Sequence, residues 1–385
     1  MSTVNGTLTL SEVREREFPF VQDCTYLNGA EQGPLPARTA VVVREVAEAT
    51  QAPGTPRLAA LPPYERLARE RLARLIGAAP GDIVFTSNTT HGMNIAMQGI
   101  AWRTGDNIVV PQREFPALAA AALHLRARGV EARGVPVTGA GPTVDDIMAR
   151  VDGRTRAIAC SAITWNTGYR ADLETLGARC ARAGCLLIVD GIQLAGAAQL
   201  DVNAARVSTL ALHGYKWLLA GFGVGALYVA PTALDQIAPT FIGAQAVRVV
   251  PEAADGPLDW QPGAARYQAG GGNKIGLAAL ATSLGLLEEL GLAAIEARNR
   301  ALAEYLYAHL ARNPAVTIVS PPDPARRSQI IVFTLGSKER DTALLEALTA
   351  QHISVALRPL GLRVSPNFYN TEEELDRLLA ALAGV

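Results

Sequence analysis

One stretch, residues 185 to 225, constrains the fold of this chain more than any other part of the sequence. It contains two short apolar runs, Cys185–Val189 and Val207–Leu212, and the start of a third, Val224–Val229, with turn residues between them. Short apolar runs bounded by turn residues are typical of buried strands. Asp190 follows the first run, and Lys216 follows the second after His213-Gly214-Tyr215. Because residues just past the carboxyl ends of strands line the crevice of an open α/β sheet, we expect both side chains there.

An acid and an amine in one crevice have a specific use. A lysine binds an aldehyde as a Schiff base, and a carboxylate keeps a pyridine nitrogen protonated. Together they meet the needs of pyridoxal phosphate. Two residues alone do not decide the matter, because a structural ion pair, or two unrelated strand-end charges, would give the same pattern.

The wider stretch resembles the class V aminotransferases of fold type I, which include cysteine desulfurases, isopenicillin N epimerase, kynureninase and several C–S lyases. Their pattern is a strand, D-x-x-Q, a second strand, and a lysine before a Gly-rich turn. Here the pattern reads Asp190-Gly191-Ile192-Gln193, Tyr215-Lys216-Trp217 and Gly221-Phe222-Gly223. The resemblance extends from about Tyr26 to about Leu379 and implies pyridoxal phosphate as cofactor.

The resemblance implies an α/β fold of the fold type I transferase kind. We expect a mainly parallel, seven-stranded-type sheet flanked by helices in a large domain, and a smaller α+β domain. The expected boundaries are an N-terminal arm and small-domain segment (1–36), a large domain (37–274), and a linking helix with the C-terminal small domain (275–385). The Pro-rich segment 51–63 is expected to be a loop, and 240–270 a loop with a short strand.

Composition excludes several partners. The net charge of −1 gives no electrostatic basis for binding nucleic acid or an acidic membrane. No apolar stretch approaches the roughly 18 residues of a membrane span, and the first residues lack a signal-peptide pattern. The cysteines form no C-x-x-C pair, so we expect reduced core cysteines in a cytoplasmic protein, and no metal site. They are Cys24, Cys160, Cys180 and Cys185.

Several residues are candidates for holding the cofactor. Thr89 and Thr90 open a helix after a strand, and a helix N-terminus suits a phosphate, although plain N-capping is the alternative. The resemblance implies that Thr90 belongs to the phosphate cup and that Phe115 stacks on the pyridine ring; core packing is the alternative for Phe115. It also implies that Asn166 meets the ring hydroxyl, with Trp165 as the alternative occupant.

The residues around Lys216 have further implied roles. Gln193 would reach the ring hydroxyl or the lysine side of the cofactor, and His213 the phosphate. Tyr215 would donate to the phosphate or relay protons. Gly271 replaces a threonine that binds the phosphate of the neighbouring subunit in the family, which leaves only a backbone N–H there. The analogy implies a homodimer with a shared active site.

The C-terminal segment contains the main candidates for binding the substrate. Arg363-Val364-Ser365 and Tyr369-Asn370-Thr371 resemble the family pattern R-x-S-x-x-x-Y-N-T, whose arginine binds a substrate α-carboxylate. Arg363 takes that role by resemblance, with Arg358 as a second candidate and a surface ion pair as the alternative. Asn28 and Ala30 match a family segment that lines the substrate pocket.

The expected chemistry starts at Cα of an amino acid, with Lys216 as base. Residues 320–362 contain no cysteine, whereas desulfurases need a nucleophilic cysteine just before the C-terminal arginine. We therefore expect a C–S lyase acting on a cysteine-type conjugate in specialised metabolism. An epimerase, an aminotransferase and a decarboxylating deaminase remain alternatives. A catalytically silent scaffold is disfavoured, because a crevice lysine without a function would carry a desolvation cost.

Overall fold

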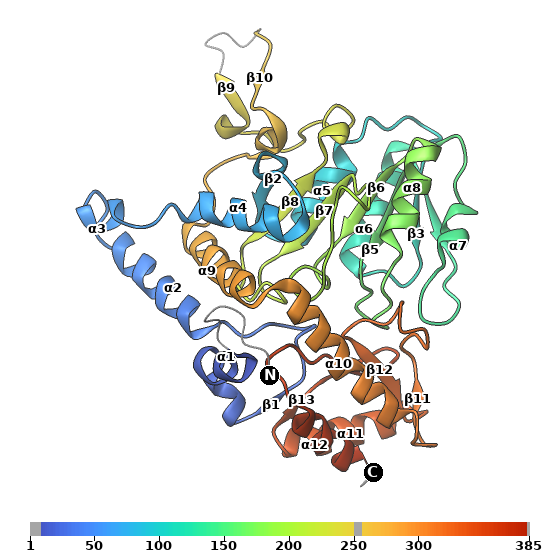
Figure 1. Cartoon of the computed structure of the whole chain (residues 1–385). Coiled ribbons are helices and arrows are strands. Elements are labelled where there is room, and N and C mark those ends of the chain that lie inside the picture. The colour runs from blue at the N-terminus through green and yellow to red at the C-terminus, as the bar shows by residue number, and fades with distance from the viewer. Residues whose placement is uncertain (1–8, 250–255, 383–385) are drawn as a thin grey trace.

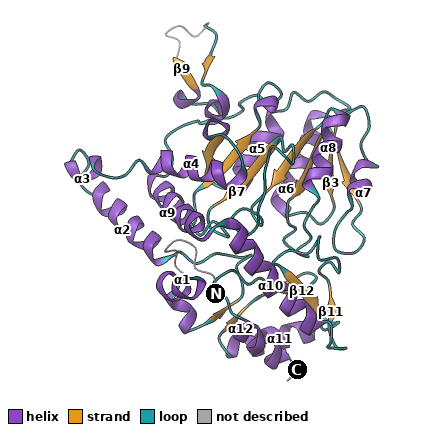
Figure 2. Ribbon diagram, viewed as in Figure 1, coloured by secondary structure: helices purple, strands orange, loops and turns teal. Residues whose placement is uncertain are grey.

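The computed structural model describes residues 9–249 and 256–382. Figures 1 and 2 show a large sheet with helices around it, and a smaller region below it where the C-terminal part of the chain lies. No single helix of the described residues has the length and apolar composition to cross a membrane. The bent pair α9 (Lys274–Leu290) and α10 (Leu292–Leu310), at 79° to each other, passes that test only when taken together.

The large sheet contains seven strands in the order β2-β8-β7-β6-β5-β3-β4. Strand β8 is antiparallel to both of its neighbours, and the remaining pairs are parallel, so the expected mainly parallel sheet is confirmed. Nearly all residues of the central strands are buried, as expected for a sheet covered on both faces. The strands are β2 Ile83–Thr86, β3 Asn107–Pro111, β4 Glu131–Val135, β5 Thr155–Ser161, β6 Leu186–Asp190, β7 Thr209–His213 and β8 Gly225–Val229.

Helices cover the large sheet, and α5 is the one that bears on the site. It begins at Thr89 directly after β2, and a Cβ at its Gly92 would lie 3.1 Å from Cβ of Ala211 on β7. The missing side chain therefore lets α5 approach β7 closely. Helix α9 packs against both α2 and α4. The helices are α2 Ala37–Thr50, α4 Tyr64–Ile76, α5 Thr89–Gly99, α6 Pro116–His124, α7 Val144–Met148, α8 Leu173–Ala183 and α9 Lys274–Leu290.

A second, antiparallel sheet has the order β11-β12-β15-β14 and its own hydrophobic cluster. The N-terminal segment joins this region, because β1 pairs with β13 and Leu27 lies in the cluster. The three domain boundaries stay predictions. The elements are β1 Thr25–Tyr26, β11 Thr317–Ile318, β12 Ile331–Thr334, β13 Ile353–Ser354, β14 Ala356–Arg358, β15 Gly361–Val364, α10 Leu292–Leu310, α11 Lys338–Ala350 and α12 Glu372–Leu382.

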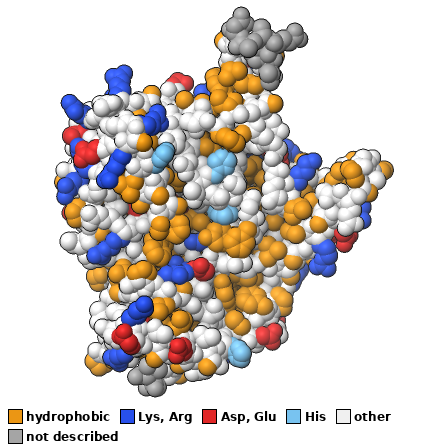
Figure 3. Space-filling model, turned by 180° about the vertical axis from the view of Figure 1, so that it is seen from behind, with side chains coloured by type: hydrophobic (Ala, Val, Ile, Leu, Met, Phe, Trp, Pro, Cys, Tyr) orange, Lys and Arg blue, Asp and Glu red, His pale blue; other side chains and the backbone are white. Residues whose placement is uncertain are grey.

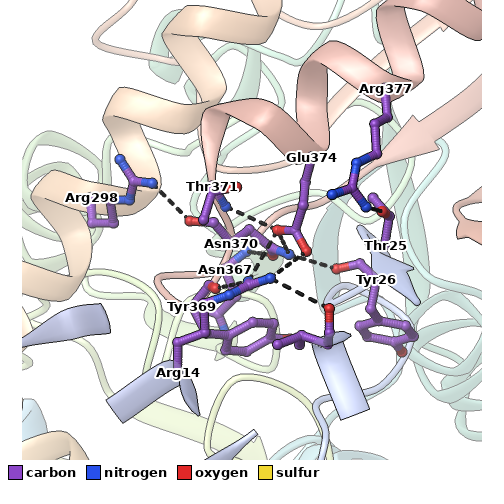
Figure 4. Close-up of polar contacts among 11 residues, drawn as sticks. Arg14, Thr25, Tyr26, Arg298, Asn367, Tyr369, Asn370, Thr371, Glu374 and Arg377 are labelled. Atoms are coloured by element: carbon purple, nitrogen blue, oxygen red, sulfur yellow. Dashed lines mark hydrogen bonds and ion pairs between the residues drawn. The ribbon is translucent and has the colours of Figure 1, made fainter. Parts of the chain in front are cut away.

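The Tyr369-Asn370-Thr371 motif fastens the N-terminal segment to this region (Figure 4). Glu374 on α12 is buried and accepts hydrogen bonds from the Asn370 side chain at 2.8 Å and the Thr371 backbone at 2.9 Å. It also pairs with Arg14 of α1 (Leu10–Glu17) at 2.9 Å. Asn370 in turn donates to the Tyr26 carbonyl at 3.0 Å. The network therefore holds the chain just before residue 28 in place.

Two expected loops contain regular structure. The segment 51–63 was expected to lack helix, but α3 (Pro56–Ala59) forms there, because proline is well suited to the first turn of a helix. In 240–270 one short strand was expected, but two form and pair with each other, β9 (Val247–Val249) and β10 (Asp259–Trp260). Residues 250–255 between them lie outside the described residues.

Candidate active site

One cavity lies where β6 and β7 end and α5 begins, as expected for a crevice at the carboxyl edge of an α/β sheet. It brings together residues from five separate segments of the chain. Among the residues proposed from the sequence, those that line it are Thr89, Thr90, Phe115, Trp165, Asp190, Gln193, His213, Tyr215 and Lys216.

Lys216 and Asp190 are both almost fully buried in this cavity. Burial and the positive charge of Arg363 lower the pKa of Lys216 to about 8, although Asp190 acts in the opposite direction. Burial raises the pKa of Asp190 to about 6, opposed by a hydrogen bond from the Ile192 N–H and by Lys216. The neutral, nucleophilic form of this lysine is therefore far more accessible near neutral pH than that of an ordinary lysine. A cation placed against Asp190 would favour the charged carboxylate.

The opposite end of the cavity is suited to an anion. Thr89 and Thr90 occupy the first turn of α5, where backbone N–H groups and the helix dipole favour negative charge. Asn88 caps the helix by accepting from the His91 N–H at 2.8 Å, so capping and anion binding occur at the same terminus. His213 stands nearby, and burial together with the charge of Lys216 lowers its pKa to about 4. Its imidazole is therefore neutral.

The cavity wall also contains two aromatic side chains. Phe115 is 40% exposed and meets Trp165 edge to face, with ring centroids 5.9 Å apart. The Asn166 side chain is buried outside the cavity lining and donates to the Arg113 carbonyl at 3.1 Å. The structure thus puts Trp165 in the cavity wall rather than Asn166, because the chain turns at this point and the two neighbours point in different directions.

Gln193 has partners that differ from the expected ones. Its side-chain oxygen accepts from the Trp217 indole at 2.8 Å, and its nitrogen donates to the Ala30 carbonyl at 3.0 Å. These bonds join the β6 turn to the residue after Lys216 and to the N-terminal segment. Ala30 is fully buried, and Asn28 forms a bridge with Ser365 beside β15. These three residues therefore position the segment that borders Arg363.

Arg363 lies on β15 with its side chain only 2% exposed, directly behind the cavity wall. It donates to the Trp165 carbonyl at 3.1 Å and to Glu31 at 2.9 Å. Arg358 on β14 hydrogen-bonds to the same Glu31 oxygen. Arg363 thus does form an ion pair, as the alternative for it supposed, but as the buried partner of a half-exposed glutamate. Sequence reasoning missed Glu31, which no local pattern distinguishes from other exposed glutamates.

Pyridoxal phosphate fits this set of residues. Within the described residues, three polar atoms of the cavity wall are buried without a hydrogen-bond partner: Thr89 Oγ1, Trp165 Nε1 and His213 Nε2. Buried polar groups are normally paired, so spare donors and acceptors here indicate a polar ligand. Asp190 would hold a protonated ring nitrogen, Phe115 would cover the ring, Lys216 would bind the aldehyde, and the start of α5 would hold the phosphate.

Comparison with known proteins decides the family. Residues 64–378 match the family described as Aminotransferase class-V. The chain belongs to this family. Its cofactor is therefore pyridoxal phosphate, and it is a class V enzyme acting on amino acids.

Relatives of this class V enzyme cover most of its length. A "Probable cysteine desulfurase" of Methanothermobacter thermautotrophicus is 30% identical over 96% of the chain and 97% of the relative. An isopenicillin N epimerase of Streptomyces clavuligerus is 31% identical over 82% and 83%. A mutant of C-DES with glycine covalently linked to the cofactor has a TM-score of 0.87 at 27% identity, covering 96% and 98%. C-DES, a cystine C–S lyase, bound to its reaction product cysteine persulfide also has a TM-score of 0.87 and 27% identity, covering 95% and 99%.

The class V enzyme has a second buried carboxyl group that the sequence did not reveal as part of the site. Glu114 accepts from the Ser161 backbone at 2.8 Å and from the Ser161 hydroxyl at 2.5 Å. Ser161 is the register partner of Asp190 on the neighbouring strand. Burial raises the pKa of Glu114 to about 7, and the charge of Asp190 acts in the same direction. The position next to Phe115 was the only signal that could have indicated it.

Gly271 lies apart from this cavity. It is exposed, in the segment before α9, and a Cβ built on it meets nothing within 4 Å. Its contact with a neighbouring subunit's phosphate stays a prediction.

Proposed function

We propose that this class V enzyme is a C–S lyase that acts on a cysteine-type conjugate and releases a thiol, pyruvate and ammonia. The proposal rests on one observation. The site combines a lysine of lowered pKa with an arginine suited to a carboxylate, and the segment before that arginine lacks the nucleophilic cysteine of a desulfurase. Lys216 and Arg363 supply the first two features. The similarity to a cystine C–S lyase over nearly the whole length supports it.

Each residue has a defined task in this reaction. The cofactor, when bound, withdraws electrons from Cα of the substrate. Arg363 holds the α-carboxylate, which orients the Cα–H bond toward Lys216. Lys216 Nζ, whose pKa is lowered to about 8, takes the Cα proton. The Cβ–S bond then breaks, the electron pair leaves with sulfur, and Tyr215 is positioned beside Lys216 to supply a proton to the departing thiolate. The remaining 2-aminoacrylate is hydrolysed by one water molecule to pyruvate and ammonia.

The cysteine pattern argues against a desulfurase. All four cysteines precede Asp190 in the sequence, and Cys160, Cys180 and Cys185 are buried. Burial raises the pKa of Cys160, so it is a poor nucleophile. Cys24 is half-buried, and burial raises its pKa, so none of the four cysteines combines the exposure and the lowered pKa expected of a persulfide carrier. Reduced cysteines are also why we propose a cytoplasmic location.

The test is product analysis with the cofactor-loaded enzyme and a panel of S-substituted cysteines. We expect equal amounts of thiol and pyruvate, measured by mass spectrometry. Lys216→Ala is expected to form neither product. Release of alanine in place of pyruvate would contradict the proposal, because it is the product of a desulfurase.

An epimerase is the second candidate, supported by the 31% identity with an isopenicillin N epimerase. The same panel distinguishes it when run in heavy water. Intact substrate that returns with deuterium at Cα and inverted configuration, without pyruvate, would favour the epimerase. An aminotransferase or a decarboxylating deaminase would instead give a keto acid without thiol, or carbon dioxide.

We further propose that the enzyme works as a homodimer with a shared site. Apolar side chains gather over the middle of one face (Figure 3). Two exposed ones lie at or near the cavity: Phe222 (61% exposed) stacks on Tyr215 of the cavity wall, and Phe241 (67% exposed) meets His91 in the first turn of α5. Exposed apolar patches of this kind mark interfaces. Phe222→Asp with Phe241→Asp should give monomers in sedimentation experiments and weaken cofactor retention; an unchanged dimer would place the interface elsewhere.

A further inference from the structure

Glu31 covers the buried guanidinium to which the proposed function assigns the substrate carboxylate. Its Oε2 accepts from Arg363 Nη2 at 2.9 Å and also contacts Arg358. The Glu31 side chain is 53% exposed, whereas that of Arg363 is 2% exposed. A half-exposed carboxylate thus neutralises a buried cation. The half-exposed side chain is the partner that can move.

The backbone holds Glu31 at this position. The Gly29 N–H donates to the Ser365 carbonyl at 2.9 Å, and the Ala30 N–H donates to the Ser365 hydroxyl at 3.0 Å. The Glu31 N–H closes a turn on the Asn28 carbonyl at 3.0 Å. Ser365 follows Arg363 by two residues, so the turn and the arginine belong to one rigid unit. Only the Glu31 side chain is therefore free to move away.

The cluster of Glu31, Arg358 and Arg363 can bind one more anion. Two guanidinium groups face one carboxylate, which leaves one positive charge uncompensated. Nε of Arg363 and Nε of Arg358 are both buried without a partner among the described residues. Burial and the neighbouring Arg358 lower the pKa of Arg363 to about 9, so it remains charged at neutral pH. A carboxylate that binds Arg363 side-on, through Nε and Nη2, would meet the Glu31 oxygen on Nη2.

We propose that Glu31 is a specificity-determining residue, which the incoming α-carboxylate displaces from Arg363 onto Arg358. This inference rests on the proposed role of Arg363 as carboxylate binder. Binding is then an exchange of one carboxylate for another. When the product leaves, Glu31 returns, so that Arg363 is not left as an unpaired buried charge. Glu31 thereby lowers the preference of the site for carboxylate-bearing amines over simple amines.

The experiment measures binding rather than turnover. The cofactor-loaded enzyme is titrated with L-alanine, which has no leaving group at Cβ, and with ethylamine, which has no carboxylate. Cofactor absorbance reports both equilibria. Glu31→Gln should lower the Kd of L-alanine by about tenfold, the value of about one charge-assisted hydrogen bond, and should not lower that of ethylamine. Glu289→Gln is the matched control, because Glu289 is also 53% exposed and also pairs with an arginine, Arg38.

Two outcomes overturn the inference in distinguishable ways. In the first outcome, Arg363→Ala weakens L-alanine binding, but Glu31→Gln either leaves the Kd of L-alanine unchanged or lowers the Kd of L-alanine and ethylamine equally. The proposed carboxylate exchange is then wrong, while Arg363 still binds the substrate carboxylate. If Arg363→Ala leaves L-alanine binding unchanged, Arg363 does not bind the carboxylate, and both proposals about this cluster fail. When Arg363→Ala is already present, adding Glu31→Gln should no longer change the Kd of L-alanine.

Discussion

Glu374 should contribute much more to stability than Glu372, although both lie in the first turn of α12. Glu374 is 2% exposed and accepts from Asn370, Thr371 and Arg14, whose own side chain is 19% exposed. Glu374→Gln keeps the size and one acceptor oxygen, but it turns an amide N–H group toward Arg14. Removing one partner of a buried pair costs about 3–5 kcal/mol, and because Arg14 is partly exposed we expect about 3 kcal/mol.

Glu372 provides the matched control. It is 40% exposed and pairs with Arg298 at 2.6 Å, and exposed pairs contribute only about 0–1 kcal/mol. Urea unfolding of both variants, followed by circular dichroism with saturating cofactor, gives the two free energies of unfolding. A loss below about 1 kcal/mol for Glu374→Gln, or equal losses for the two variants, would refute the argument that burial decides the contribution.

Three further predictions concern the site. The rate at which apoenzyme binds pyridoxal phosphate should rise with pH through about 8, because the neutral Lys216 amine is the nucleophile. Arg363→Gln removes a nearby positive charge, so the midpoint of this rise should move to higher pH. Stopped-flow measurements can follow both rates. Thr89→Val should weaken pyridoxal phosphate about tenfold or more in equilibrium dialysis but leave pyridoxal, which lacks the phosphate, unaffected; equal losses would place Thr89 away from the phosphate. The pKa of Glu114 is raised from 4.5 to about 7, so its contribution to stability is complete below about pH 4.5 and is lost as the pH rises through about 7. The apoenzyme of Glu114→Gln should therefore gain stability relative to the wild-type apoenzyme between pH 5 and 8, and a constant difference would show that Glu114 stays ionised.

The sequence predicted the parts of the fold that local pattern determines. The apolar runs before Asp190 and Lys216 are β6 and β7. Lys216 and Asp190 follow from the same logic, because the ends of neighbouring parallel strands must meet at one edge of the sheet. These features can be predicted from the spacing of apolar residues and from the rule that ligands bind at the carboxyl ends of strands in an α/β sheet.

The remaining features depend on contacts between distant parts of the chain. Glu31 meets Arg363 across 332 positions, and Gln193 reaches Ala30 across 163, so no window of sequence contains either pair. The choice between Trp165 and Asn166 depends on the direction of one turn, which neighbouring residues do not specify. The Tyr369-Asn370-Thr371 motif was evident as a pattern, but its action on Tyr26 and Arg14 appears only once β1 lies beside β13.

The most direct test of the account is to locate the amine that binds the cofactor. The holoenzyme is reduced with borohydride, which makes the cofactor–lysine bond permanent, and is then digested and mapped by mass spectrometry. We expect the added mass on Lys216 and none on the Lys216→Ala variant. Label on Lys274 or Lys338, or label that persists in Lys216→Ala, would contradict the placement of the reaction in the cavity between β6, β7 and α5.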